Sequence, residues 1–394
     1  MPADRLFGPI FTTPAMAAAV SDEAWLRAML DFEAALARAE GRLGVIPVAA
    51  AEAIASACAG ADLDIETIGR QAAASGTPVV PMLQALRARL PSDATDHLHR
   101  GATSQDVLDT AMMLVVRHGL ELLAADLEAV AAGAAHLARH HGGTLMVART
   151  LLQQAAPTTF GLKAAGWLGA TMEAADGLAD YRRSRPAVQL GGAAGTLAAL
   201  ASDGPAVVRE LAGELGLAAP LLPWHTARAR VSELGAVLAL VAGTMGKIAL
   251  DVVLLAQSEV GEVAEPAGEG RGVSSSMPHK RNPASSVAAL ACARGVQAQA
   301  GLLLDTMVQP HERATGEWQS EWAAVSEALR LCAGAVSRMR EVLEGLEVHP
   351  DRMRANLEAG GELLSEEAGG ATAQLAAGQL IAATLAAYEA RRRG

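Results

Sequence analysis

The sequence predicts an all-α protein built on a bundle of long helices. Hydrophobic residues make up 51% of the 394 residues but aromatic residues only 3%, so alanine and leucine must fill the interior, as between closely packed helices. Strand-forming residues lie mostly inside runs with helical spacing, which predicts little β structure. Proline, which breaks helices, is absent between Pro91 and Pro157 and between Pro223 and Pro266. These two intervals leave room for helices of many turns.

Proline and glycine also divide the chain into expected domains. These are an N-terminal helical domain (1–100), a central long-helix bundle domain (101–346) and a C-terminal helical cap (347–394). In the first domain, an amphipathic helix over 23–40 should end near Gly41 and Gly44. The long helices expected in the central domain cover 104–140, 232–258, 283–308 and 318–346. The third of them should have Asn282 as its N-cap and Pro283 in its first turn.

Charge and composition narrow the kinds of partner. The formal net charge of -11 argues against nucleic acid or an anionic membrane. The segment 234–256 is the membrane candidate, but Lys247 and Asp251 stand one helical turn apart in it, so we expect a buried bundle helix. Three widely spaced cysteines should be buried and reduced, and no signal peptide is evident, so we expect a soluble, cytoplasmic protein. Helices with so little polar surface predict an oligomer.

The segment 268–283, GEGRGVSSSMPHKRNP, has the composition of an active-site lid. Glycines allow a backbone to move, prolines break the neighbouring helices, and the cations can hold a carboxylate. A simple linker would not need Met, His, Lys and Asn in a fixed order. We therefore expect a functional loop here.

A second polar segment, HLHRGATSQDVLDTA over 97–111, should begin the first long helix. Thr103 and Asp106 have the spacing of a capping box, which is a structural role. The N–H groups of this helix start, with the hydroxyls of Thr103 and Ser104, can also bind a substrate carboxylate. His99 could donate another hydrogen bond to that anion, although a structural role for it stays open.

Two signals are weaker. The segment 148–161, ARTLLQQAAPTTFG, places Thr150 and Gln153 in a stretch broken by proline, which is equally compatible with a helix junction. His97 and His99 have a spacing that metal ligands can have, but no third ligand is evident, so we expect no metal. The pair Arg228 and Arg230 could face a substrate, but we expect it at the surface, where arginines in polar segments usually lie.

Together the three segments resemble the signature regions of the fumarase/aspartase superfamily, and MPHKRNP matches the best known of them. WLRAMLDFEAALARAEGRLGVIP near the start and PWHTARAR in the middle extend the resemblance over nearly the whole chain. The resemblance implies a homotetramer with a 20-helix core, in which each active site draws on three subunits. It also implies that a C–X bond beside a carboxylate is cleaved or formed through a carbanion, without a cofactor.

The resemblance assigns roles to individual residues. Ser274, Lys280 and His99 would be catalytic, with Ser274 transferring a proton. Lys280 and Asn282 would hold the carboxylate and its dianionic aci form. Matching substrate-binding positions are Thr103, Ser104, Thr150, Gln153 and Asn282, and further carboxylate-binding candidates are Arg281 and Arg313.

One departure from the superfamily pattern points to a substrate. Leu151 stands where the lyases carry a histidine that is usually assigned to proton transfer at the leaving group. A carboxylate that is the leaving group, or that adds to an alkene in the reverse reaction, is already ionised at pH 7. It does not need such a proton. The chain therefore most closely resembles the cycloisomerases of the superfamily, which close a lactone ring on a carboxymuconate. GATSQDVLDTA, PWHTARAR and HERATGEWQSEW carry this closer resemblance, which implies a small tricarboxylate substrate.

Other functions stay open. Adenylosuccinate lyase has similar segments but would need nucleotide contacts and normally the histidine that is Leu151 here. Some members of the superfamily are structural, crystallin-like proteins, and a helical scaffold for binding would likewise show no turnover. The presence of Ser274, Lys280 and Asn282 favours an enzyme, because a structural protein has no need of such a loop.

Overall fold

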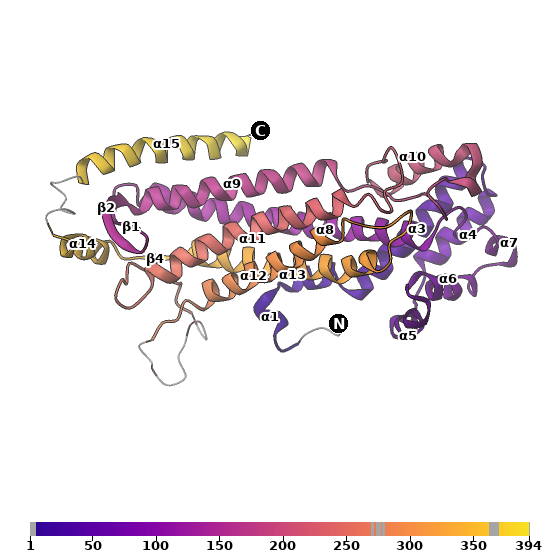
Figure 1. Cartoon of the computed structure of the whole chain (residues 1–394), viewed down its shortest axis with the longest axis horizontal. Helices are drawn as coiled ribbons and strands as arrows, with labels where there is room; N and C mark the ends of the chain where they lie inside the picture. Colours follow the sequence, from indigo (N-terminus) through magenta and orange to yellow (C-terminus); the bar gives the residue numbers. More distant parts are fainter. Residues whose placement is uncertain (1–4, 269–271, 273–276, 278–279, 362–369, 394) are drawn as a thin grey trace.

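The computed structural model describes residues 5–268, 272, 277, 280–361 and 370–393. It is an elongated all-α molecule in which long helices lie side by side (Figure 1). The central helices are α8 (Ser104–His140), α9 (Phe160–Ser184), α11 (Ala229–Leu255), α12 (Ala284–Asp305) and α13 (Glu317–Gly345). Neighbours in this group pack directly against one another and bury a continuous apolar core. The predicted fold class is confirmed.

The shorter helices gather at one end of these long helices. They are α1 (Gly8–Phe11), α2 (Pro14–Ala19), α3 (Asp22–Arg42), α4 (Val48–Ala59), α5 (Ile65–Ser75), α6 (Val79–Arg87), α7 (Ser92–Thr95), the 3-10 helix η1 (Ala198–Asp203) and α10 (Gly204–Leu215). Most of them lie at the right of Figure 1, where α10, although far along the chain, packs against α3. Towards the C-terminus, α14 (Pro350–Ala359) contacts the strand β1 (Leu145–Thr150), and α15 (Ala371–Arg393) lies along α9. The three-domain division remains a prediction.

The long helices match the predicted ranges closely. The first begins at Ser104 and ends at His140, as the capping box and the proline-free interval indicated. The start of α12 differs, because its N-cap is Pro283 rather than Asn282. The carboxylate of Glu265, from a preceding loop, accepts hydrogen bonds from the N–H groups of Ser285 and Ser286 at 3.0 and 2.7 Å. A distant acidic residue thus caps the helix and leaves the Asn282 amide free to donate to Gly272 O.

A β-hairpin follows α8, where the sequence was equally compatible with a helix junction. Strands β1 (Leu145–Thr150) and β2 (Gln153–Thr159) pair antiparallel, with Thr150 opposite Gln153. The two-residue turn consists of Leu151 and Leu152, both with positive φ (51° and 63°), and their side chains are largely exposed (96% and 72%). Such turns normally contain Asn or Gly, so no local hairpin signal was present. A second pair, β3 (Val263–Ala264) and β4 (Glu347–Val348), ties the loop before α12 to the end of α13.

Two bundle helices keep an apolar outer face. By length and composition alone, α11 and α12 could each cross a membrane, the second of them a candidate that the sequence analysis did not name. Both pack against α13 and against each other, as core helices of a bundle do. Lys247 and Asp251 form the i,i+4 ion pair that their spacing predicted. Large apolar side chains nevertheless remain exposed on these helices, namely Leu240, Leu250, Val287, Leu302 and Leu304.

Candidate active site

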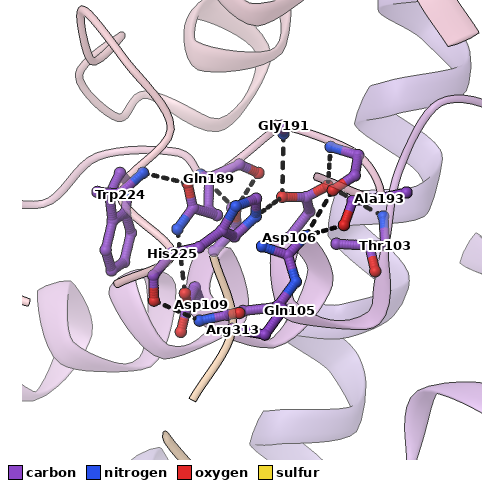
Figure 2. A network of polar contacts seen from close by, with 12 residues as sticks. Thr103, Gln105, Asp106, Asp109, Gln189, Gly191, Ala193, Trp224, His225 and Arg313 are labelled. Carbon is purple, nitrogen blue, oxygen red and sulfur yellow. Dashed lines mark hydrogen bonds and ion pairs between the residues drawn. The ribbon is translucent and has the colours of Figure 1, made fainter. Parts of the chain in front are cut away.

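The start of α8 is held in place by the carboxylate of Asp106 (Figure 2). Its two oxygens accept hydrogen bonds from the N–H groups of Thr103, Gly191 and Gly192 at 3.0, 3.0 and 2.9 Å. The buried His225 ring donates to the same carboxylate from Nε2 at 2.6 Å. Asp106 therefore joins the helix start to two distant loops and has no capacity left for substrate. Its predicted structural role is confirmed.

The turn before α8 is strained around His99. His99 has φ 62°, which is uncommon for a residue other than glycine. Gly101 (φ 71°) must remain glycine, because a Cβ there would stand 2.6 Å from Leu200. Gly192 (φ 68°) approaches the same turn so closely that a Cβ would lie 2.8 Å from the Gly101 carbonyl oxygen. Such backbone strain is typical of functional sites.

Several predicted site residues meet at this helix start. Thr103 and Ser104 are half-buried at its N-terminus, and His99 lies one turn of chain before them. Arg313 reaches the same place from the loop between α12 and α13 and donates to Gly192 O and Ala193 O at 2.6 and 3.0 Å (Figure 2). The result is a patch of N–H groups, hydroxyls, an imidazole and a guanidinium, which suits a carboxylate.

The second predicted region lies at the other end of α8. Thr150 and Gln153 face each other across the exposed tip of the β1–β2 hairpin. The 37 residues of α8 separate this tip from Thr103, which is about 55 Å at about 1.5 Å per residue. Figure 1 shows the hairpin at the left end of the bundle and the start of α8 towards the right. Within one chain these two regions cannot act on the same small substrate.

The third region lies at the start of α12. Ser274 falls outside the described residues, and Lys280 is exposed. Arg281 forms two hydrogen bonds of 2.8 Å to Glu347 and a third of 2.6 Å to Glu265 O, and the bonds to Glu347 lower the pKa of that carboxyl. These contacts anchor the base of the loop. The guanidinium of Arg281 is thus already engaged by Glu347 and Glu265 O. Substrate binding by Arg281 remains a prediction.

A buried ionic network lies beneath the start of α8. Arg228 is almost fully buried and binds both oxygens of Asp109 at 2.7 and 3.0 Å, and also Glu321. The indole of Trp318 and the amide of Gln189 donate to the same Asp109 carboxylate at 3.0 and 3.1 Å. The predicted surface position of Arg228 was wrong. A usable signal existed, because Asp109 follows Asp106 by three residues on a helix with few other charges.

Arg230 does not lie freely at the surface either. Its guanidinium stacks on the Trp224 ring at 4.8 Å and donates to Arg185 O, while that of Arg228 stacks on the same ring at 4.8 Å. Burial lowers the pKa of Arg230, as does the charge of Arg185. The PWHTARAR segment therefore stabilises the fold under the site, and the two arginines hold its tryptophan between them.

Two buried glutamates of α3 lie near the site and were missed at the sequence level. Glu33 accepts a hydrogen bond of 2.6 Å from His99 Nδ1. Glu40, seven residues later on the same face, is equally buried, and neither of its oxygens has a hydrogen-bond partner among the described residues. Burial raises the pKa of Glu40 to about 8, although Arg100 opposes the rise, and Glu33 adds to it. A charged residue inside an otherwise apolar helical face was the available signal.

The buried Glu40 predicts a pH dependence of stability. Its pKa is raised on folding, so its stabilising contribution is complete below the unfolded pKa and is lost as the pH rises through about 8. Glu40→Gln should remove this loss and raise the free energy of unfolding at pH 8 by roughly 2–3 kcal/mol relative to its effect at pH 5. Urea titrations of both proteins at the two pH values test this. Equal differences at both values would contradict it.

Comparisons with known proteins agree with the fold. The sequence profile of a family described as "Lyase" matches residues 10–298, and the chain therefore belongs to this lyase family of the fumarase/aspartase superfamily. The 3-carboxy-cis,cis-muconate cycloisomerase of Bradyrhizobium diazoefficiens is 46% identical over 92% of this chain and 81% of its own length. The nitrosuccinate lyase of Streptomyces davaonensis is also 46% identical, over 92% of this chain and 78% of its own.

A solved structure shows the same likeness in three dimensions. The crystal structure of the 3-carboxy-cis,cis-muconate lactonizing enzyme from Pseudomonas putida superimposes with a TM-score of 0.89 at 39% identity. The match covers 97% of this chain and 88% of that one. The enzymes that this chain resembles thus include several that act on small carboxylates, as their names state.

Proposed function

We propose that this protein is a 3-carboxy-cis,cis-muconate cycloisomerase, which converts 3-carboxy-cis,cis-muconate to 4-carboxymuconolactone. The observation that carries the proposal is the set of relatives with this name in four bacteria, 37–46% identical over nearly the whole chain. The anion-binding patch at the start of α8 supports it, because a tricarboxylate needs several converging donors. This reaction belongs to the catabolism of protocatechuate.

The proposed reaction begins with a carboxylate of the substrate. One of its oxygens attacks the conjugated alkene and forms the new C–O bond, while the alkene electron pair moves onto an adjacent carboxyl group as an aci dianion. Lys280, Asn282 and the Thr103–Ser104 helix start stabilise this charge as preorganised donors. Ser274 then gives a proton to the carbanion carbon, which completes the lactone.

The residue at the hairpin tip fits this chemistry. Leu151 cannot donate a proton, and its side chain is 96% exposed at the end of β1. The attacking carboxylate has a pKa of about 4 and needs no proton partner at pH 7. An amine or alkoxide leaving group would need a proton donor, since general acid catalysis raises the rate about 10²–10⁴-fold.

A second candidate is nitrosuccinate lyase activity. It is favoured by the relative of that name at 46% identity. Nitrite is a weak base and leaves without a proton, so Leu151 does not separate this reaction from lactone formation. The two reactions share a carbanion beside a carboxylate and differ in the third substituent of the substrate.

A spectrophotometric assay separates the candidates. Adding the enzyme to 3-carboxy-cis,cis-muconate should abolish the absorbance of the conjugated diene, while 2-nitrosuccinate and adenylosuccinate should give turnover at least about a hundredfold lower in kcat/KM. Nitrite release from 2-nitrosuccinate without loss of the diene would replace the proposal by the second candidate. Turnover of adenylosuccinate alone would reject both.

We further propose that the active protein is a homotetramer with shared active sites. The exposed leucines and valine of α11 and α12 give these helices an unpartnered apolar face, which a second copy would cover. The hairpin tip, with two exposed leucines, likewise presents apolar surface that a second copy would cover. The separation of the three regions within one chain supports sites assembled from different chains.

Mixing two inactive variants tests the shared site. Ser274→Ala and His99→Asn should each have little activity, but co-refolded in equal amounts they should recover roughly a quarter of the wild-type activity. Each site would take His99 from one chain and Ser274 from another. Half of the chains carry each intact residue, so about a quarter of the sites contain both. If both residues came from one chain, every site would contain one substitution and no activity would return.

A further inference from the structure

The contact between Glu33 and His99 has no part in the proposed reaction so far. Glu33 lies on α3, 66 residues before His99, and its side chain is fully buried. The distance from His99 Nδ1 to Glu33 Oε1 is 2.6 Å, which is short for a charge-assisted hydrogen bond. The second oxygen of Glu33 is buried without a partner among the described residues. A buried carboxylate with one strong bond is costly unless that bond is to a cation.

The geometry leaves one nitrogen of His99 for a ligand. Because a carboxylate only accepts hydrogen bonds, Nδ1 carries the hydrogen in this contact. Nε2 is then the atom that can face the half-open site, where the His99 side chain is 15% exposed. The 2.6 Å contact of Nδ1 with Glu33 sets the orientation of the ring.

The charges around His99 favour its protonated form. Burial on its own lowers the pKa of His99, but the charge and hydrogen bond of Glu33 and the charge of Asp106 on α8 oppose this, and the pKa is raised overall. Arg87 on α6 acts in the opposite direction. Arg100 and Glu40 interact with each other, and burial raises the pKa of Glu40 to about 8. Arg313, on the loop between α12 and α13, donates to Gly192 O and Ala193 O. Glu33 is thus the anion in direct contact with the ring.

We propose that Glu33 is a positioning residue that holds His99 as an imidazolium, so that Nε2–H binds a carboxylate of the substrate. This inference rests on the proposed function only for the identity of that carboxylate. Glu33 itself does not touch the substrate. It supplies the negative charge that keeps His99 cationic and the acceptor that fixes its orientation.

The first test follows the titration of His99 and needs no substrate. Proteins labelled with ¹³C at histidine Cε1 are titrated by NMR, and the His99 signal is assigned by its loss in His99→Asn. In Glu33→Gln the His99 pKa should fall by about one to three units, the range that removal of an adjacent opposite charge produces. Glu40→Gln is the matched control, since it changes an equally buried glutamate of the same helix, and it should leave the His99 titration unchanged. An unshifted His99 in Glu33→Gln would overturn the proposal.

The second test measures carboxylate binding with tricarballylate, an unreactive tricarboxylate. Calorimetry should show wild-type binding that weakens as the pH rises through the His99 pKa. In Glu33→Gln the affinity at pH 7.5 should fall about tenfold, the equivalent of one charge-assisted hydrogen bond. In turnover, KM should rise by a similar factor while kcat changes little. A tenfold loss of affinity in Glu40→Gln as well would indicate a general structural effect and contradict the proposal.

The outcomes separate this inference from the proposed function. If 3-carboxymuconate is not turned over but the His99 pKa falls in Glu33→Gln and tricarballylate binds less tightly, the Glu33–His99 pair stands and only the substrate is wrong. If the diene is turned over but the titration does not move, the function stands and the role of Glu33 falls. Should Glu33→Gln fail to fold, Glu33→Asp keeps the charge but withdraws it by one methylene, and it should give a smaller shift in the same direction.

Discussion

Replacement of Arg228 by methionine is expected to lower the free energy of unfolding by about 3–5 kcal/mol, because two buried carboxylates lose their counter-ion. The side chains of Arg228, Asp109 and Glu321 are at most 1% exposed, so water cannot replace the missing charge. Burial raises the pKa of Glu321 even with Arg228 present. Urea denaturation followed by circular dichroism measures the loss, at one protein concentration because the proposed tetramer would make stability depend on concentration.

Two controls show whether the charge is responsible. Arg230→Met removes the neighbouring arginine, which stacks on the same Trp224 ring but is not fully buried, and should cost about 1 kcal/mol or less. Neutralising the whole network with Asp109→Asn, Arg228→Met and Glu321→Gln together should recover most of the loss, because no buried charge is then left uncompensated. Equal losses for the single Arg228 and Arg230 variants would contradict the argument.

Replacement of Ser274 by alanine is expected to lower kcat about 10²–10⁴-fold while KM changes little. The proton that Ser274 is proposed to donate moves only in the transition state, so the ground-state complex should be unaffected. Loss of the diene absorbance at saturating substrate gives kcat, and progress curves at lower concentrations give KM.

The chain offers its own controls beside this residue. Ser275 and Ser276 follow Ser274 directly, so Ser275→Ala and Ser276→Ala make the same chemical change in the same segment. Both should retain kcat within a few-fold of the wild-type value. If either of them lost as much activity as Ser274→Ala, the proton donor would have been assigned to the wrong serine or the loss would reflect the segment as a whole.

The long helices could be predicted because their signals are local. Proline-free intervals and the capping box at Thr103 and Asp106 determined the range of α8 without any tertiary information. The start of α12 could not be predicted in the same way, since Glu265 caps it from a separate loop. The hairpin at Leu151 and Leu152 was missed because its turn lacks the residues that normally form one.

The candidate site was predictable to the extent that it depends on short motifs. Thr103 and Ser104 stand at the start of α8, and Arg313 bonds to the neighbouring Gly192 O, whereas their binding of a substrate remains a prediction. The pairing of the supporting residues was not predictable, because Glu33, Arg228 and Glu321 come from segments far apart in the chain and a local pattern does not show which partner each one meets. Arg228 is an example. Arginines in polar segments normally lie at the surface, but the Arg228 side chain is buried together with its two carboxylate partners.

The contacts of Arg281 have a consequence for how the segment before α12 can respond to a ligand. Arg281 donates to Glu265 O and pairs with Glu347, so the two feet of the intervening stretch of about 15 residues are pinned together before any substrate arrives. The entropic cost of bringing these two points of the chain together is therefore incurred during folding and not in each catalytic cycle. The joining of these two points therefore depends on Glu347, which lies on β4 beside β3, as much as on Arg281 itself.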